Sequence, residues 1–228
     1  MTPTKLITVL LAEDHAIVRQ GLLALLKADG SFLMVGEAKN GREAVQLALS
    51  LRPDVILMDI AMPVLNGLET TRQILAAQPA ARVIVLSAHS DEIYVEKMVE
   101  VGVAGFLEKQ SSAEILTKAI HEVARGHTYF SAAIAKRLAD SPSKPRGRDG
   151  LVKAHATRLT SRETEVLQLV AEGSANKQVA AELGISIKTV EKHRQHLMDK
   201  LNIHDTAGLT RYAITAGIIE NSVQLKVT

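Results

Sequence analysis

Short apolar runs alternate with amphipathic stretches over the first half of the chain. Such near-continuous runs are typical of strands that helices cover on both faces, as in parallel sheets. Between the runs, apolar residues recur at helical spacing, for example at Val18, Leu22 and Leu25. The pattern predicts an α/β domain over residues 1–128, with a doubly wound, five-stranded parallel sheet. The expected strands are Leu6 to Ala12, Phe32 to Val35, Val55 to Met58, Val83 to Leu86 and Ala104 to Leu107.

A different pattern occupies residues 157–228. Thr160 and Glu163 fit a capping box at the start of a helix, and Gly173 suits its end. Ser186 is a candidate N-cap after a turn at Gly184. We therefore predict an all-α, four-helix domain that contains a helix-turn-helix. The other three helices are expected from about Ala175 to Leu183, from Ile187 to about Leu201 and from about Asp205 to Ala216.

The segment between the two predicted domains has the composition of a linker. A candidate helix from Ser131 to Ala139 precedes residues 141–150, which are rich in Ser, Pro, Gly and charged side chains. These residue types oppose regular structure. Residues 129–156 are therefore predicted to be a linker with a short helix.

Composition narrows the setting and the partners. The sequence has no apolar run of the 18 residues that a membrane-spanning helix needs, no cysteine and no secretory signal, so we expect a cytoplasmic protein without membrane contact. Aromatic residues are only 3%, which argues against single-stranded nucleic acid as a ligand. Up to Thr128 there are 12 basic and 15 acidic residues of the 27 and 25 in the chain, which leaves 15 basic and 10 acidic residues beyond it. The basic second half suits a phosphate-bearing partner, although ordinary charge scatter could also give this split.

Acidic, hydroxyl and lysine side chains with candidate chemical roles follow the ends of the predicted strands. Glu13 and Asp14 follow the first run, Asp59 the third, Ser87 the fourth and Lys109 the fifth. Parallel strands bring these ends to one edge, where three carboxylates repel one another unless a hard dication such as Mg²⁺ lies among them. We expect Asp59 to be the nucleophile that forms an aspartyl phosphate, with Lys109 and the Ser87 hydroxyl on the phosphoryl oxygens.

These residues resemble the receiver domain of two-component response regulators, a flavodoxin-like fold, over residues 5–126. The motifs are Glu13-Asp14, Asp59-Ile-Ala-Met-Pro63 with Asn66-Gly67, Ser87-Ala88 and Lys109. The resemblance implies that Asp14, Asp59 and the backbone carbonyl of Ala61 ligate Mg²⁺ directly and that Glu13 acts through water. It also implies that Phe106 swings inward when Ser87 moves toward the phosphoryl group. Plain core packing is the alternative for Phe106.

Three features of the receiver half leave alternatives open. Gln110 stands where receiver domains usually have a proline after the lysine that corresponds to Lys109. The Lys109–Gln110 peptide bond is therefore either trans in a reshaped loop or cis and strained, because a cis bond without proline costs about 2.5–4 kcal/mol. His89 either tunes the lifetime of the aspartyl phosphate or is an exposed histidine without a role. A helix from Asp91 to Val101 carries apolar residues on more than one face, which indicates either a contact surface that rearranges on phosphorylation or deep packing.

The third predicted helix of the basic domain has the periodicity of a helix that reads DNA. Val190, Leu197 and Leu201 form one apolar stripe, and charged residues lie opposite. An ordinary charged surface helix would look the same. The sequence Leu159-Thr-Ser-Arg-Glu163 and the segment from Ile185 to His193, however, closely resemble the LuxR-type domain over residues 157–218.

That resemblance implies a recognition helix from Ile187 to Leu201 and a dimer contact through the last helix. Glutamate, lysine and glutamine can read base edges in the major groove, whereas other polar residues contact phosphates or position the helix. We expect Glu191, Lys192 and Gln195 to contact bases, and Lys177, Lys188, Thr189, Arg194 and Lys200 to contact phosphates or position the helix.

Both resemblances together identify a response regulator of the NarL/FixJ family. They predict a transcriptional regulator whose homodimer binds double-stranded promoter DNA when a sensor histidine kinase phosphorylates Asp59 with Mg²⁺ present, and RNA polymerase is a further expected partner. One alternative is a regulator that binds DNA regardless of phosphorylation and uses the receiver as a dimerisation module. Another is a phosphohydrolase, which we do not expect because no substrate-binding insertion or second general acid is evident.

Overall fold

The computed structural model describes residues 6–87, 92–131, 134 and 159–219, without the side chains of residues 92–94. Contacts divide the chain into two compact units, Met1–Ser141 and Pro142–Thr228, and each unit is treated by itself. Most of the predicted linker and of its short helix lies outside the described residues, so the predicted domain limits at residues 128 and 156 stay predictions.

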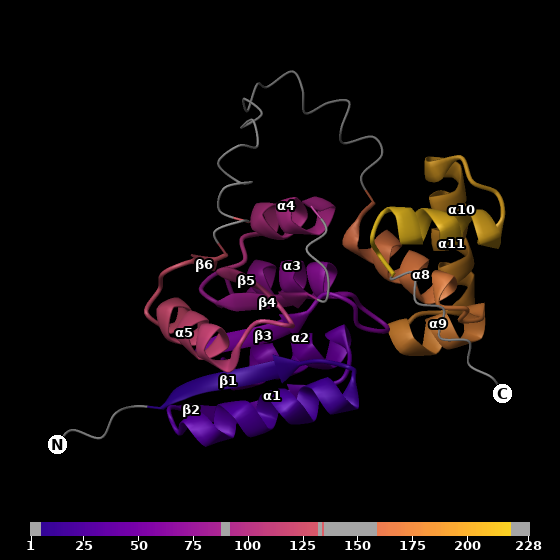
Figure 1. The fold of residues 1–228 in the computed structure, drawn as a ribbon. Coiled ribbons are helices and arrows are strands. Elements are labelled where there is room, and N and C mark those ends of the chain that lie inside the picture. The colour runs from indigo at the N-terminus through magenta and orange to yellow at the C-terminus, as the bar shows by residue number, and fades with distance from the viewer. Residues whose placement is uncertain (1–5, 88–91, 132–133, 135–158, 220–228) are drawn as a thin grey trace. The chain divides into compact units, whose positions relative to one another are not determined.

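The first unit is built on a parallel sheet with the strand order β2-β1-β3-β4-β5-β6 (Figure 1). The predicted doubly wound sheet is confirmed, but its size is corrected from five strands to six. The sixth strand has only two residues, too few to form an apolar run. It pairs with β5, and the Tyr129 N–H donates at 2.9 Å to the carbonyl of Ala104, the residue before β5. The strands are β1 Ile7–Ala12, β2 Phe32–Ala38, β3 Val55–Asp59, β4 Val83–Ser87, β5 Gly105–Glu108 and β6 Tyr129–Phe130.

Helices cover both faces of this sheet. One buried cluster joins apolar strand residues to α2, α3 and α4, and a second joins the other strand residues to α1 and α5 (Figure 1). All five residues of β3 and of β4 are buried because both faces are covered, which explains why their sequences lack alternation. The helices are α1 Ala16–Asp29, α2 Gly41–Leu51, α3 Gly67–Ala77, α4 Glu92–Val101 and α5 Ala113–Ala124.

The second unit is the predicted set of four helices. The capping box at the start of α8 is present, since the Thr160 side chain accepts from the Glu163 N–H and the Glu163 side chain accepts from the Thr160 N–H. Gly184 ends α9 with φ 62°, a left-handed conformation that glycine adopts without strain, and Ser186 caps α10. The helices are α8 Ser161–Ala171, α9 Asn176–Leu183, α10 Ile187–Leu201 and α11 Thr206–Thr215.

The predicted apolar stripe of α10 packs largely as expected. Val190 and Leu197 are fully buried, Leu201 is half-buried, and Leu209 and Ala213 of α11 are fully buried in the same unit. This packing leaves the opposite side of α10 exposed. Among the described residues of the chain, no helix is long and apolar enough to cross a bilayer.

Candidate phosphoacceptor and DNA-binding sites

Carboxylates converge at the carboxyl edge of the sheet. Glu13 and Asp14 directly follow β1, and Asp59 ends β3, the strand beside it. One ligand atom each from these three residues and from His15 lies within 4.8 Å of the others. Glu13 and Asp59 are almost fully buried, at 0% and 2% exposed. The structure therefore places side by side the carboxylates that the sequence predicted to share a site.

Lys109 contributes the positive charge of this site. Its ammonium lies 2.8 Å from Asp59 Oδ2 and 2.9 Å from Glu13 Oε2. Burial raises the pKa of Asp59 to about 7, an effect that Lys109 opposes and Glu13 reinforces. Burial also lowers the pKa of Lys109, but Asp59 and Glu13 outweigh it, so that pKa lies above its ordinary value. The buried lysine is thus held in its charged form by the two carboxylates.

The charges and donor atoms of the cluster fit Mg²⁺. When all four groups are ionised, three carboxylates and one ammonium leave two negative charges uncompensated, which one dication balances. Within the described part of the chain, Glu13 Oε2, Asp14 Oδ1 and Asp59 Oδ2 are buried and have no hydrogen bond of standard geometry, although Lys109 and His15 lie at ion-pair distance. Mg²⁺ prefers such oxygen ligands and retains several waters of its own.

The loop after β3 holds Asp59 tightly. Asn66 caps α3 by accepting from the Glu69 N–H, and the Gly67 N–H donates to the Ile60 carbonyl at 2.8 Å. A Cβ at Gly67 would lie 2.1 Å from the carbonyl oxygen of Asp59. The motif that the sequence displays as Asn66-Gly67 is therefore a point of close contact between helix and strand. Only glycine fits there.

The same loop brings Ala61 next to the Asp59 carboxylate. The Ala61 N–H donates to Asp59 Oδ1 at 3.4 Å. The Leu65 N–H donates to the Pro63 carbonyl at 2.8 Å and closes a three-residue turn. Val64, at the centre of this turn, has φ 71°, which is strained for a β-branched residue. Strain of this kind is often retained beside functional sites.

The predicted switch residues lie on neighbouring strands. Ser87 is buried at the end of β4 and pairs in register with Glu108 of β5. Phe106 is fully buried in the cluster that includes α4, so it points inward here. This position fits the packing alternative, and its predicted swing stays a prediction. His89 lies outside the described residues.

The loop after Lys109 resolves one alternative. The described chain contains no cis peptide bond, so the Lys109–Gln110 bond is trans. The Ser111 N–H donates to the Glu108 carbonyl at 2.9 Å, and the Lys109 N–H donates to the Ser87 carbonyl at 2.7 Å. These two bonds fix the start of a tight turn that presents the lysine to the cluster without proline.

The structure describes the packing of α4 from Val95 to Val101. Val95 and Met98 are buried in the sheet core, while Val99 and Val101 are partly exposed. The side chains of Ile93 and Tyr94 lie outside the described residues. Deep packing accounts for two of the apolar residues that α4 carries, and a contact role for the remaining ones stays a prediction.

Sequence reasoning missed Arg19 as a part of this site. The side chain on α1 is 11% exposed and donates to the backbone carbonyls of Glu13 at 2.9 Å and of Asp14 at 3.2 Å. Its Nε lies 3.5 Å from Glu37 Oε2. Arg19 therefore orients the peptide that carries two of the carboxylates. No sequence pattern singles out one arginine in the first turn of a helix.

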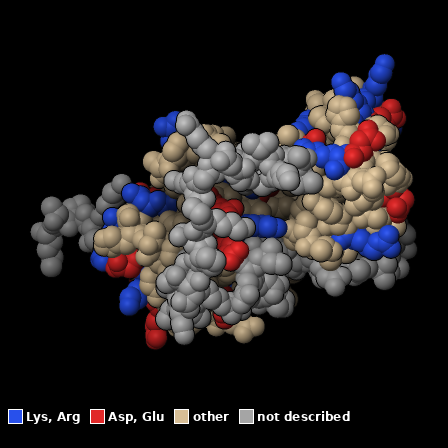
Figure 2. All heavy atoms as spheres, turned by 90° about the horizontal axis from the view of Figure 1, so that it is seen from above, with Lys and Arg blue, Asp and Glu red and all other residues tan. Residues whose placement is uncertain are grey.

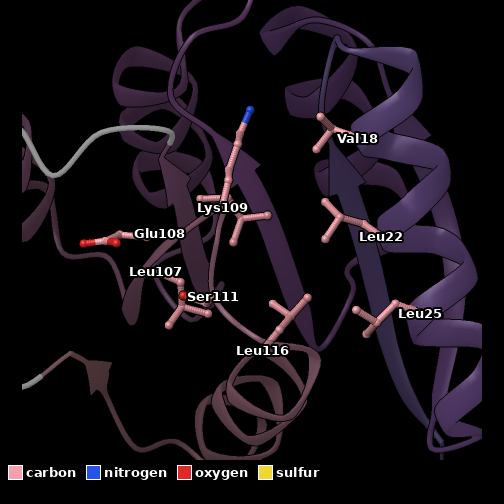
Figure 3. Close-up of a pocket in the computed structure, with 9 residues that line it drawn as sticks. Val18, Leu22, Leu25, Leu107, Glu108, Lys109, Ser111 and Leu116 are labelled. Atoms are coloured by element: carbon pink, nitrogen blue, oxygen red, sulfur yellow. The ribbon is translucent and has the colours of Figure 1, made fainter.

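An apolar groove between α1 and α5 borders the site (Figure 3). Val18, Leu22 and Leu25 of α1 form one wall, and Leu116 of α5 forms part of the other (Figure 3). Lys109 extends along one end of the groove, so this residue borders both the groove and the acidic cluster. The remaining lining residues are Leu86, Leu107, Glu108 and Ser111.

Five of the predicted DNA contacts are exposed on the helical unit. Figure 2 shows lysine and arginine side chains interspersed with acidic ones on the visible face of this unit, not an uninterrupted basic patch. Gln195 donates to Asp199 Oδ1 at 2.8 Å, one turn along the helix. The amide of this candidate base reader must therefore leave Asp199 to reach a base. The exposed residues are Lys177, Lys188, Glu191, Lys192 and Gln195.

Arg194 and Lys200 are partly buried and engaged inside the unit. Arg194 donates to Asn176 Oδ1 at 2.9 Å and to Thr206 Oγ1 at 3.1 Å, and so joins α10 to α9 and α11. The Lys200 ammonium lies 2.8 Å from Glu163 Oε2 of the α8 capping box. Of the two predicted roles for these residues, the contacts favour positioning of α10 over phosphate contact.

Thr189 also has a partner near the start of α10. Its hydroxyl lies 2.8 Å from that of Ser186, the N-cap residue, and its N–H donates to the same Ser186 oxygen at 3.1 Å. Because both groups serve the cap, Thr189 contributes first to the start of α10.

Comparison with known proteins agrees with this architecture. Residues 9–121 match the response regulator receiver domain, and residues 157–213 match the luxR family of bacterial regulatory proteins. The fold and the acidic edge therefore define the class of the protein as a response regulator with a LuxR-type DNA-binding domain.

Relatives with these domains match most of the chain. The transcriptional regulatory protein LiaR of Bacillus subtilis is 38% identical over 208 residues, which is 91% of this chain and 97% of LiaR. DegU of Brevibacillus brevis, also a transcriptional regulatory protein, is 34% identical over 87% of this chain and 89% of its own. The crystal structure of a LuxR-family response regulator from Aurantimonas covers 60% of this chain and 97% of its own, with 31% identity and a TM-score of 0.56. The chain belongs to the NarL/FixJ family of two-component response regulators, as its sequence predicts.

Proposed function

We propose that a sensor histidine kinase phosphorylates Asp59 and that this event controls binding of double-stranded promoter DNA by α10. The observation that carries the proposal is the buried Asp59 carboxylate, in contact with Lys109 and beside Glu13 and Asp14. A structural ion pair would need one carboxylate for one lysine. The excess of carboxylates at the edge of a sheet favours a site for a dication and a phosphoryl group.

Asp59 supplies the nucleophile of this reaction. One carboxylate oxygen attacks the phosphorus atom of a phosphohistidine, the P–N bond breaks, and the imidazole leaves with its electron pair and takes up a proton. Lys109 and the Ser87 hydroxyl then contact the phosphoryl oxygens. Asp14, Asp59 and the Ala61 carbonyl would hold Mg²⁺ directly, and Glu13 through water. When bound, Mg²⁺ neutralises the charge of the carboxylates and of the phosphoryl group.

The proposed switch begins with the cations of the site. Lys109 now contacts Asp59 and Glu13, and it must share its charge with a phosphoryl group when one arrives. Ser87 and Phe106 lie on β4 and β5, next to the changing charge. Their movement would shift an equilibrium that already exists toward a homodimer, which binds two half-sites and gains affinity from both.

The exposed face of α10 is the proposed reading surface. Glu191, Lys192 and Gln195 would contact base edges, and Lys177 and Lys188 would contact phosphates. Arg194, Thr189 and Lys200 would hold the helix in place. In this proposal the DNA-bound dimer acts on transcription with RNA polymerase as a further partner, and the chain regulates transcription instead of turning over a substrate.

The test compares the wild type with Asp59→Asn. An operator is first selected from random double-stranded DNA with protein treated with Mg²⁺ and acetyl phosphate. We expect this treatment to promote dimerisation and operator binding of the wild type and to leave Asp59→Asn unchanged. Equal responses of both proteins would favour the regulator that acts without phosphorylation. Sustained turnover of small phosphate esters would instead favour a phosphohydrolase.

A further inference from the structure

His15 lies at the acidic cluster, although the proposed phosphoryl transfer does not use it. Its ring Nδ1 is 3.0 Å from Asp14 Oδ1 and 3.3 Å from Glu13 Oε1. Its backbone N–H donates to the same Glu13 oxygen at 3.1 Å. The side chain is 51% exposed, so an ion can reach the ring from solvent.

The two oxygens of Glu13 face different groups. Oε2 contacts the Lys109 ammonium at 2.9 Å, whereas Oε1 lies beside His15. Asp59 Oδ2 also contacts Lys109, and Asp59 Oδ1 is the acceptor of the Ala61 N–H. A cation can therefore bind beside His15, Glu13 Oε1 and Asp14 Oδ1 while Lys109 keeps its contacts with the other oxygens.

The spacing of the ligand atoms suits one ion. Atoms of Glu13, Asp14, His15 and Asp59 lie within 4.8 Å of one another. Ligands on opposite sides of an ion with bonds of about 2.0–2.2 Å lie at most about 4.4 Å apart. A small inward movement of His15 and Asp14, whose side chains are 51% and 24% exposed, is enough to close the site around an ion.

We propose that His15 is a nitrogen ligand to first-row transition-metal dications, such as Co²⁺ or Zn²⁺, when they occupy this cluster. Mg²⁺ favours oxygen ligands, whereas imidazole together with carboxylates suits later first-row metals. Asp14 Oδ1, which is buried and has no standard hydrogen bond, lies on the same side as His15, and the buried Glu13 and Asp59 carboxylates supply the remaining charge. The inference rests on the proposed function, because both assign a dication to this cluster.

The experiment titrates the full chain with Co²⁺ and, separately, with Mg²⁺. Calorimetry gives the dissociation constants for the wild type, His15→Ala, His15→Asn and the control His127→Ala. His127 is a matched control because it is 66% exposed and its Nδ1 lies 2.8 Å from a carboxylate oxygen of Glu122, away from the site. We expect His15→Ala to weaken Co²⁺ binding roughly 10-fold or more and to weaken Mg²⁺ binding less, whereas His127→Ala matches the wild type.

Proton NMR of the Co²⁺ form supplies a direct signature of the ligand. An imidazole bound to Co²⁺ through Nδ1 keeps its other N–H, whose exchangeable proton is then strongly shifted by the paramagnetic ion. We expect this resonance in the wild type and His127→Ala but not in His15→Ala or His15→Asn. Equal Co²⁺ affinities of wild type and His15→Ala, or a shifted resonance that persists without His15, would overturn the inference. If neither His15 variant folds, absence of the resonance from the wild type overturns it and presence supports it.

Phosphorylation of the wild type with Mg²⁺ and acetyl phosphate separates this inference from the proposed function. Phosphorylation without His15-dependent Co²⁺ binding refutes the nitrogen ligand alone. His15-dependent Co²⁺ binding without phosphorylation refutes the proposed function and leaves the metal site intact.

Discussion

Replacement of Gly67 by alanine should damage the proposed phosphoacceptor site through packing alone. The added Cβ would lie 2.1 Å from the Asp59 carbonyl oxygen and 2.9 Å from Ile60 Cα, and Cβ contacts shorter than 3.0 Å essentially do not occur. The first turn of α3 and the end of β3 must therefore separate by about 0.9 Å, the difference between 3.0 and 2.1 Å. Both obstructing atoms belong to the backbone, so a side-chain rotation cannot relieve the contact.

Two measurable effects follow from this separation. Overpacking of a close-packed site costs about 1–3 kcal/mol, so the free energy of unfolding of the receiver unit should fall by that amount. A shift of about 1 Å at the nucleophile can slow a reaction by roughly 100-fold. We therefore expect phosphorylation of Asp59 by acetyl phosphate in saturating Mg²⁺ to slow by about 10- to 100-fold.

Gly21→Ala is the matched control for this variant. Gly21 is an exposed residue inside α1, and an added Cβ meets no atom within 4 Å. Alanine should stabilise the helix there by about 0.5–1 kcal/mol and leave phosphorylation unchanged. Chemical denaturation and phosphorylation kinetics of both variants check the two effects. A Gly67→Ala protein with the stability and rate of the wild type would refute the packing argument.

Three further predictions concern other parts of the chain. Arg19→Met removes the donor to the Glu13 and Asp14 carbonyls, so the Mg²⁺ dissociation constant measured by calorimetry should rise about 10-fold. Tighter binding would mean that the repulsion between Arg19 and the ion outweighs the positioning role of Arg19. Glu163→Gln should cost the helical unit about 0.3–1 kcal/mol at pH 7, as measured by hydrogen exchange in α8. Burial raises the pKa of Glu163, but hydrogen bonds from Lys200 and Thr160 outweigh this effect and hold the pKa below its ordinary value. The stability difference between Glu163→Gln and the wild type should therefore vanish as the pH falls through this lowered pKa. A stability difference that stays constant with pH would contradict the ion pair. Lys192→Ala should reduce discrimination between bases at one position of the operator by about 1–3 kcal/mol. Lys177→Ala should weaken binding to all DNA sequences alike and lower the slope of log affinity against log salt concentration by about 1. The reverse outcome would exchange the two roles.

Several features of the protein follow from local sequence. The near-continuous apolar runs predict β3 and β4 because strands covered on both faces have no exposed side to mark with polar residues. The capping box at Thr160 and the turn at Gly184 predict helix limits, since caps depend on residues within one turn. The residues of the acidic cluster could also be named in advance, because parallel strands all end at the same edge of the sheet.

The tertiary structure decided which groups meet, because contacts between distant residues depend on how the elements pack. The sequence predicts that Lys200, 37 residues from Glu163, contacts phosphate or positions the helix, and only the packing of α10 on α8 shows that it forms an ion pair with Glu163. The two residues of β6 become a strand only because β5 offers a free edge. Only the contact between the start of α3 and the backbone of Asp59 explains why residue 67 is glycine. Periodicity along the chain records which side of an element is buried, and the partner on that side is set by the other elements of the fold.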